Sequence, residues 1–365
     1  MTTRTDRWEH GSDFHTLLAP IELPPAPTPW WPAGAELFGS GRDAMRFVLR
    51  VGRERHGWSR LFVPDYFCQE VIAALATERL LVETYRCNPW SDVVLGGDFG
   101  RHDVLLTLPY FGQRPPPSVA PRPMRPFWVI EDHTHDPTSV WATTSHADYC
   151  VASLRKTLPI PEGGIAWSGA GPLPAAPPCT PDRERAASAK REAMWLKAAY
   201  LAGAGVDKPA FRELALEGEA SIASGDVSGM TRATRQLLPL LPIAEWRAVR
   251  RANHQRLNEA LRDLSWLTPL DAHPDGYPSA FVARVDTHER RERVRSRLIS
   301  NRVYPAVLWP LDEPVVAVSP IAREISKTIL VLHCDARYDA TDLQRVASLV
   351  AAAGNESLER ESTER

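Results

Sequence analysis

The strongest constraint on the fold comes from short apolar runs that lack the polar-apolar alternation of a half-buried strand. Residues 104–108 read Val-Leu-Leu-Thr-Leu and residues 127–130 read Phe-Trp-Val-Ile, and polar residues follow each run. Such runs predict strands that are buried on both faces. Because strands of this kind form parallel sheets covered by helices, the sequence predicts an α/β fold.

Segments before these runs supply the expected alternation of helices and strands. Residues 44–51 carry apolar side chains at helical spacing directly after the glycine-bracketed turn 39–41, and residues 70–80 are also predicted to be helical. Residues 60–64 and 81–85 are predicted strands. We therefore expect a large, mostly parallel sheet with helices on its faces.

The second half of the chain has a different pattern. Long amphipathic helices are predicted between residues 183 and 270, and the clearest of them, at 243–264, could link two domains. A compact alternation then predicts a smaller α/β domain. Its strands are expected at 280–285 and 328–332 and its helices at 290–299 and 340–353. Residues 355–365 are charged and lack a core face, so we expect a frayed tail.

Composition favours a small-molecule partner. The 365 residues include 43 basic and 45 acidic side chains, a formal net charge of -2, so no overall field attracts nucleic acid or an anionic membrane. No apolar run is long enough to span a bilayer, and the first residues lack the pattern of a secretory signal. The five cysteines are scattered, which predicts reduced thiols in a cytoplasmic protein, with no disulfide framework and no zinc site.

A polar turn at residues 153–156 is the first candidate for chemistry. Here a short apolar strand passes into a turn that offers Ser153, Arg155 and Lys156. A lysine that forms a Schiff base needs a partly desolvated setting, and Ser153 and Arg155 could anchor the phosphate of its cofactor. The alternative is a solvated turn lysine, because an isolated Ser-x-x-Lys is a short motif.

A second candidate, Glu-Asp-His-Thr-His, follows the strand predicted at 127–130. Ligands bind at the carboxyl ends of strands in open α/β sheets, so Asp132 could keep a pyridine nitrogen protonated. His135 could stack or hydrogen-bond near the same ring. The alternatives are a polar loop and a divalent metal site that uses His133 and His135.

A third candidate is the turn at residues 39–43, Gly-Ser-Gly-Arg-Asp, which opens a predicted helix. Its backbone N–H groups and the helix dipole favour an anion such as phosphate, although a plain helix start is an equally acceptable interpretation. The order of the three motifs connects them. One fold accounts for a phosphate-type turn near residue 40, an aspartate near 130, and a lysine near 156 ahead of a glycine pair.

Together these motifs resemble those of the pyridoxal-phosphate aminotransferase superfamily of fold type I, and most closely the DegT-like sugar aminotransferases. Residues 39–44 are similar to the family's Gly-Ser-Gly-Thr-x-Ala turn, and residues 131–135 to its Glu-Asp-Ala-Ala-Gln/His signature. Lys156 stands seven residues before Gly163, as the family's lysine does before its Gly-Gly pair. Residues 63–67 and 110–112 resemble its Pro-x-aromatic segment and its aromatic-Gly loop.

The resemblance implies an aspartate-aminotransferase-like α/β fold. We expect an N-terminal arm (1–30), a large cofactor-binding domain of the seven-stranded type (31–240), a linking helix with a small C-terminal domain (241–354) and a flexible tail (355–365). The cofactor would be pyridoxal 5'-phosphate. Lys156 would form its Schiff base, Asp132 would contact the pyridine nitrogen, and His135 would lie near the ring hydroxyl.

The resemblance also assigns less certain positions by their place in the motifs. Tyr66 or Phe67 would cover the cofactor ring, although either residue could simply fill the core. The other candidates are Gly41, Arg42, Ser153 and Arg155 at the phosphate, Thr231 and Arg232 from the neighbouring subunit of a homodimer, Tyr110 at the substrate, and Arg337, otherwise a solvated turn residue, at a substrate carboxylate. This sequence departs from the family at Arg42 and Thr134, where the family has Thr and Ala, and its serine stands three residues before the lysine instead of five. Residues 229–232 lie where the family has an Asn and an Arg from the neighbouring subunit, but they lack the Asn.

The expected reaction is transamination between a small-molecule amino donor and a carbonyl or sugar-type acceptor, in specialised metabolism, with Lys156 as the base that moves the proton. The same apparatus also serves decarboxylation, elimination or retro-aldol chemistry. Two alternatives come from other classes. One is a non-catalytic binding protein on this fold, and the other is a metal hydrolase that uses Asp132, His133 and His135.

Overall fold

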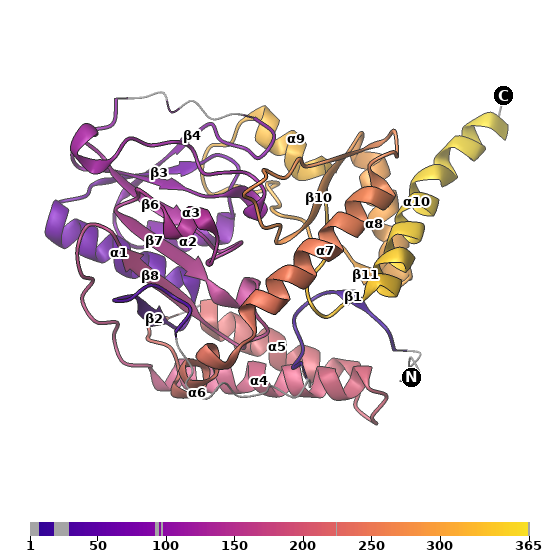
Figure 1. The fold of residues 1–365 in the computed structure, drawn as a ribbon, viewed down its shortest axis with the longest axis horizontal. Helices are drawn as coiled ribbons and strands as arrows, with labels where there is room; N and C mark the ends of the chain where they lie inside the picture. The colour runs from indigo at the N-terminus through magenta and orange to yellow at the C-terminus, as the bar shows by residue number, and fades with distance from the viewer. Residues whose placement is uncertain (1–6, 18–28, 92–94, 96–97, 224, 364–365) are drawn as a thin grey trace.

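The structure, a computed structural model, describes residues 7–17, 29–91, 95, 98–223 and 225–363. Figure 1 shows a larger unit built on one sheet and a smaller unit at the C-terminal end of the chain, with the long helix α7 (Ile243–Leu261) running between them. Within the described residues, none of the helices combines the length and the apolar composition that crossing a bilayer requires.

The larger unit contains a seven-stranded sheet with the strand order β2-β8-β7-β6-β5-β3-β4. Strand β8 runs antiparallel to both of its neighbours, and the pairings that join β7, β6, β5, β3 and β4 are all parallel. The predicted mostly parallel sheet is confirmed. In sheet order, the strands are β2 (Glu36–Phe38), β8 (Gly164–Ser168), β7 (Tyr149–Ser153), β6 (Trp128–Asp132), β5 (Asp103–Thr107), β3 (Arg60–Pro64) and β4 (Leu81–Tyr85).

Helix α1 (Gly41–His56) begins at the glycine-bracketed turn that the sequence indicated. The Ser40 side chain caps the helix by accepting a hydrogen bond from the backbone N–H of Asp43, and Gly57 ends it in the left-handed conformation at φ 66. Its buried apolar face packs against β7 and β8. Shorter elements complete this part of the unit: α2 (Gln69–Ala76), α3 (Val140–Thr143), and the 3-10 turns η1 (Tyr110–Gly112), η2 (Arg122–Met124) and η3 (Leu154–Lys156).

Two long helices, α4 (Pro181–Leu201) and α5 (Lys208–Ala223), pack side by side below the sheet in the view of Figure 1. Gly218 permits their close approach, because a Cβ at this position would lie 2.4 Å from Cγ of Lys190. The chain then continues through α6 (Arg232–Leu237) and the 3-10 turn η4 (Leu238–Leu240) into α7.

The smaller unit has a three-stranded antiparallel sheet in the order β12-β10-β9. Apolar residues from its strands and from helices α7, α8 and α10 form one buried cluster that includes Phe281, Leu298 and Val350. Its elements are β9 (Leu267–Pro269), β10 (Ala280–Val285), α8 (His288–Ser300), β11 (Val303–Tyr304), α9 (Pro320–Thr328), β12 (Ile329–His333) and α10 (Ala340–Thr363).

The described part of the N-terminal segment contacts both units. Strand β1 (His10–Gly11) pairs in parallel with β11 of the smaller unit. The Lys197 ammonium, on α4, donates to the Ser12 hydroxyl at 2.9 Å and to the Asp13 carbonyl at 2.6 Å. The Arg337 guanidinium, from the smaller unit, donates to the carbonyls of the same two residues at 3.1 and 3.0 Å.

Three predicted boundaries differ from the structure. Strand β6 continues through Asp132, so the acidic pair belongs to the strand and not to the loop behind it. Helix α2 ends at Ala76, and Arg79 takes a left-handed conformation with φ 61.

The third difference is the C-terminal end, where α10 continues to Thr363, past the helix predicted at 340–353. The flexible tail at 355–365 stays a prediction. Gly354 does not stop this helix; it makes room for Trp266, whose ring would lie 1.9 Å from an added Cβ. Residues 18–28 of the predicted N-terminal arm lie outside the described residues.

Candidate functional site

The two residues assigned to the catalytic chemistry, Asp132 and Lys156, lie at the carboxyl edge of two adjacent parallel strands. Asp132 is the last residue of β6 and pairs with Val151 of β7. Strand β7 ends at Ser153 and runs directly into the 3-10 turn that carries Lys156. This edge is where ligands bind in open α/β sheets.

Asp132 is held by Thr134, a residue noted in the sequence only because it departs from the family. Its Oδ1 accepts hydrogen bonds from the backbone N–H of Thr134 at 2.9 Å and from the Thr134 hydroxyl at 2.5 Å. The same hydroxyl accepts a hydrogen bond from the Ser153 N–H at 2.9 Å. Within the described residues, Oδ2 of Asp132 receives no hydrogen bond, and burial raises the pKa of this carboxyl.

Lys156 makes no hydrogen bond or ion pair with any residue in the described part of the chain. The residue lies at the surface, although neighbouring groups surround its amine. The adjacent Arg155 guanidinium lowers the pKa of its amine, and desolvation adds to the shift. A lowered pKa increases the fraction of neutral, nucleophilic amine.

His135 is a neutral ring beside this amine. Burial, together with the Lys156 charge, lowers the pKa of His135 to about 4. Its Nδ1 accepts a hydrogen bond from the Phe111 N–H at 3.3 Å. In a neutral ring the proton therefore lies on Nε2, which can donate a hydrogen bond to a ligand oxygen.

The predicted phosphate turn lies against the end of β7. A Cβ at Gly41 would lie 2.5 Å from Cβ of Ser153, and a Cβ at Gly164 would lie 2.1 Å from the Ser40 carbonyl oxygen. Three motifs that are far apart in the sequence are thus brought into contact, and glycine is required at both positions. The N-terminal N–H groups of α1 consequently lie next to Ser153, as a phosphate site requires.

The two predicted phosphate-binding arginines, Arg42 and Arg155, meet a carboxylate that sequence analysis missed. Oε1 of Glu219 lies 2.6 Å from the Arg155 guanidinium and 3.4 Å from that of Arg42. Oε2 of Glu219 lies 2.6 Å from the Lys190 ammonium. No sequence motif distinguishes Glu219 from the other glutamates of α5.

The aromatic residues predicted at the cofactor and the substrate are core residues. Tyr66 and Phe67 are 0% and 2% exposed, and the Tyr66 hydroxyl donates to the Leu308 carbonyl. The Tyr110 hydroxyl is buried between two backbone carbonyl oxygens, at 2.6 Å from Tyr66 and 2.9 Å from Cys87. Within the described residues, the burial of these rings matches the core alternative for Tyr66 and Phe67. Contacts of the three rings with cofactor or substrate stay predictions.

Trp309, which the sequence analysis missed, lies among these rings. It enters from the segment between β11 and α9, and its ring centroid is 5.6 Å from that of Phe67, 5.8 Å from that of Phe111 and 6.0 Å from that of His135. It is partly exposed, unlike the tyrosines below it. The smaller unit thus contributes one aromatic ring to the site.

Two further predicted site residues are held by contacts within their own chain. Arg337 is neither solvated nor free, because its guanidinium pairs with both carboxylate oxygens of Asp335, at 2.7 and 2.8 Å, and its side chain is 1% exposed. Thr231 is fully buried, with its hydroxyl capping α6 and its N–H bonded to Glu162 at 2.8 Å. Both groups are engaged within their own chain. Arg232 is exposed.

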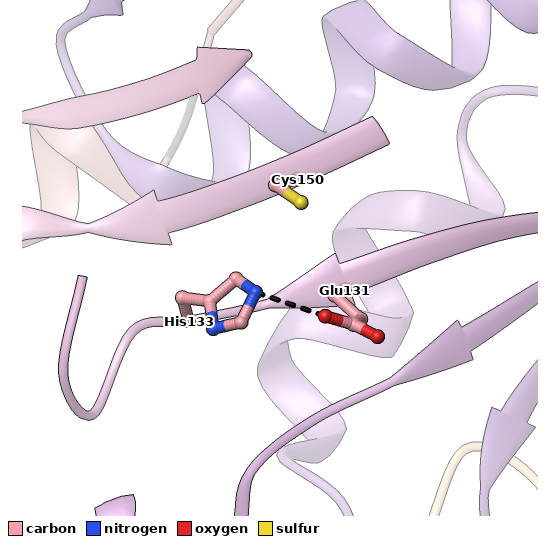
Figure 2. A group of neighbouring side chains, drawn as sticks. All are labelled: Glu131, His133 and Cys150. Atoms are coloured by element: carbon pink, nitrogen blue, oxygen red, sulfur yellow. Dashed lines mark hydrogen bonds and ion pairs between the residues drawn. The ribbon is translucent and has the colours of Figure 1, made fainter. Parts of the chain in front are cut away.

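The metal site that was considered as an alternative is not assembled among the described residues. Asp132 and His135 face Thr134 and Phe111, whereas Nε2 of His133 lies 3.0 Å from the Glu131 carboxylate and the His133 ring stacks on Trp167. Figure 2 shows His133 and Glu131 together with Cys150 of the neighbouring strand.

These three side chains are buried, and their potential ligand atoms lie within 4.8 Å of one another. Glu131 already accepts a hydrogen bond from the Ser145 hydroxyl at 2.7 Å, and burial raises the pKa of the Cys150 thiol. The arrangement is that of a hydrogen-bonded pair beside a neutral thiol. Cys150 was missed as a neighbour because no metal-ligand spacing connects it to His133.

Comparison with solved structures gives the fold. Spr1654 from Streptococcus pneumoniae, assigned as a sugar aminotransferase, has a TM-score of 0.59 at 12% identity and covers 90% of this chain and 88% of its own. PseC from Helicobacter pylori, an aminotransferase in pseudoaminic acid biosynthesis, has a TM-score of 0.57 at 12% identity, with coverages of 88% and 87%. The aminotransferase TlmJ from Streptoalloteichus hindustanus has a TM-score of 0.55 at 16% identity, with coverages of 88% and 85%.

Neither protein-family models nor curated proteins give a match. The solved structures confirm the predicted aspartate-aminotransferase-like fold, that of the fold-type-I pyridoxal-phosphate enzymes. Spr1654 has itself been solved in apo, pyridoxal-phosphate and pyridoxamine-phosphate forms.

Proposed function

We propose that this chain is a pyridoxal-phosphate-dependent aminotransferase that transfers an amino group to a small carbonyl or sugar-type substrate. One observation carries the proposal. The unpaired amine of Lys156 and the buried carboxylate of Asp132 lie at the same edge of adjacent parallel strands, in an aminotransferase-like fold. The structural neighbours support a sugar-type substrate, since DesI was solved with its TDP-sugar product.

The residues of the site fit the cofactor. Asp132 has one buried carboxylate oxygen held by Thr134 and one that receives no hydrogen bond from the described residues, which suits a charged N–H partner. A phosphate group would lie at the N-terminus of α1 beside Ser153, within reach of guanidinium groups. When bound, pyridoxal phosphate supplies an aldehyde that reacts with amines and a pyridinium ring that withdraws electrons.

Each side chain then has a distinct task. Asp132 keeps a proton on the pyridine nitrogen, because a buried carboxylate is stabilised by a cationic partner. Lys156, whose pKa is lowered, would act as the base that accepts and returns a proton at its amine. His135 would offer its Nε2 proton to the cofactor, and the Phe111 N–H fixes its tautomer.

The working unit in this proposal is a homodimer with shared active sites. The exposed Arg232, at the start of α6, is the residue that would reach the neighbouring subunit's site. Thr231 has no part in it, because its polar groups are used within its own chain.

The deciding experiment is covalent labelling of Lys156. The protein incubated with pyridoxal phosphate should turn yellow, and borohydride should fix the cofactor to the peptide that contains Lys156. The Lys156→Ala variant should lose the label while its circular dichroism stays unchanged, and the Lys327→Ala variant, which removes an exposed lysine of α9, should keep it. If the wild type carries no borohydride-fixed cofactor, the proposed function is wrong.

A further inference from the structure

We propose that Glu219 is a built-in anion that competes with the phosphate group of the cofactor for Arg42 and Arg155, and so sets the affinity of the site for phosphate. This inference rests on the proposed function, because it takes the α1 turn as the phosphate site.

Glu219 reaches the turn from outside the sheet. Arg42 follows Gly41 at the start of α1, and Arg155 stands two residues after Ser153, so the two arginines flank the point where α1 meets β7. Both point to the same oxygen of Glu219. The carboxylate therefore occupies the donors that border the phosphate turn.

The contacts of Glu219 with its cationic neighbours differ in length and in solvent exposure. Lys190 is nearly buried, with 9% of its side chain exposed, and its 2.6 Å contact with Glu219 is fixed by the close packing of α4 on Gly218. The Arg42 contact is longer, at 3.4 Å, and Glu219 itself is 35% exposed. The Arg155 contact is as short as that of Lys190, at 2.6 Å. Lys190 can thus retain Glu219 while the Arg42 guanidinium exchanges partners.

The charge balance favours a second anion. Three cations surround one carboxylate, and the Lys156 amine adds a further positive charge nearby. Nε of Arg155 is buried and has no hydrogen-bond acceptor among the described residues. Burial alone would raise the pKa of Glu219, but Arg155 and Lys190 lower it to about 2, so the carboxylate stays ionised at neutral pH.

A phosphate and a carboxylate that share the same guanidinium groups repel each other, while arginine binds either one with two parallel hydrogen bonds. Removing the charge of Glu219 should therefore strengthen phosphate binding. With the partial exposure of the site, we expect an effect of about tenfold, which falls as salt screens the charges.

The test compares Glu219→Gln with Glu217→Gln, which removes the same charge from an exposed position of α5. The dissociation constants of inorganic phosphate and of pyridoxal phosphate are measured on cofactor-free protein at low and high salt. Glu219→Gln should bind both about tenfold more tightly at low salt, and Glu217→Gln should match the wild type.

Unchanged or weaker binding of both ligands by Glu219→Gln would overturn the inference, because Glu219 would then only position the arginines. Failure of the proposed function gives a different result, in which no variant carries a borohydride-fixed cofactor. In that case the phosphate measurements alone decide the inference, and a protein that binds neither ligand refutes both.

Discussion

The Thr134 hydroxyl lies between Asp132 and Ser153, donating to the Asp132 carboxylate and accepting from the Ser153 N–H. One side chain thereby sets the position of the carboxylate on β6 relative to the end of β7, which leads into Lys156. The family that this sequence resembles has an alanine at this position. An alanine has no hydroxyl with which to make either hydrogen bond.

Thr134→Val should disturb both ends of this link, because it keeps the shape of the side chain but removes the hydroxyl. The partly buried Ser153 N–H would lose its acceptor, at a cost of about 1 kcal/mol in the free energy of unfolding. The rate of the half-reaction with an amino donor should also fall, and Thr134→Ser should restore both. Urea denaturation and stopped-flow absorbance measure the two effects, and a valine variant with wild-type values would remove Thr134 from this role.

Asp132→Asn should retain the fold and the bound cofactor, since the amide oxygen can still accept from Thr134. A neutral amide cannot hold the pyridine nitrogen protonated, so the half-reaction should slow by a factor on the order of 100 or more. Cofactor absorbance confirms occupancy, and single-turnover kinetics give the rate. An occupied Asn variant with a near-normal rate contradicts the assignment.

The fold was predictable because the strongest signals in the sequence are local. Buried strands and glycine-bracketed turns determine the sheet, and the order of the motifs places Asp132 and Lys156 at one edge. Contacts made by single side chains from distant elements were not predictable. In the sequence, Glu219 looks like any helical glutamate, although it pairs with Arg155. The sequence around Arg337 is equally compatible with a solvated turn and with the observed pair with Asp335.

Tyr66 and Phe67 illustrate why a motif position does not fix a role. Each residue has two acceptable environments by its place in the motif, the cofactor face or the core, and in the structure both rings are buried. Trp309 belongs to no recognisable motif, so its place beside His135 could not be predicted from the sequence.

Glu162 should make the stability of the protein depend on pH. It is fully buried, and burial raises its pKa to about 7, although the Thr231 N–H stabilises its charged form. A carboxyl whose folded-state pKa is raised destabilises the fold once it ionises, so stability should fall as pH rises from about 4.5 to 7 and stay low above that, by about 3 kcal/mol in total.

Glu162→Gln keeps the acceptor for Thr231 and cannot ionise. It should therefore gain stability over the wild type at pH 8, and the two proteins should converge near pH 4.5. The urea midpoint across this range measures the difference. A difference that does not change with pH would show that Glu162 does not titrate in this window.

The homodimer proposal makes a complementation prediction. Lys156→Ala and Arg232→Ala chains, each inactive alone, should recover activity when they are refolded together, because one site of the mixed dimer would combine an intact lysine with an intact neighbouring arginine. Mass measurement should confirm that mixed dimers form. Mixed dimers without activity, or an active monomer in light scattering, would count against shared sites.

The N-terminal segment ties the two units of the chain together at one point. Lys197 on α4 and Arg337 of the smaller unit both donate hydrogen bonds to Ser12 and Asp13, and His10 and Gly11 pair in parallel with β11. The orientation of the smaller unit, and with it the place of Trp309 beside His135, therefore depends on residues that have no part in the proposed reaction. Removing this segment should shift Trp309 relative to His135.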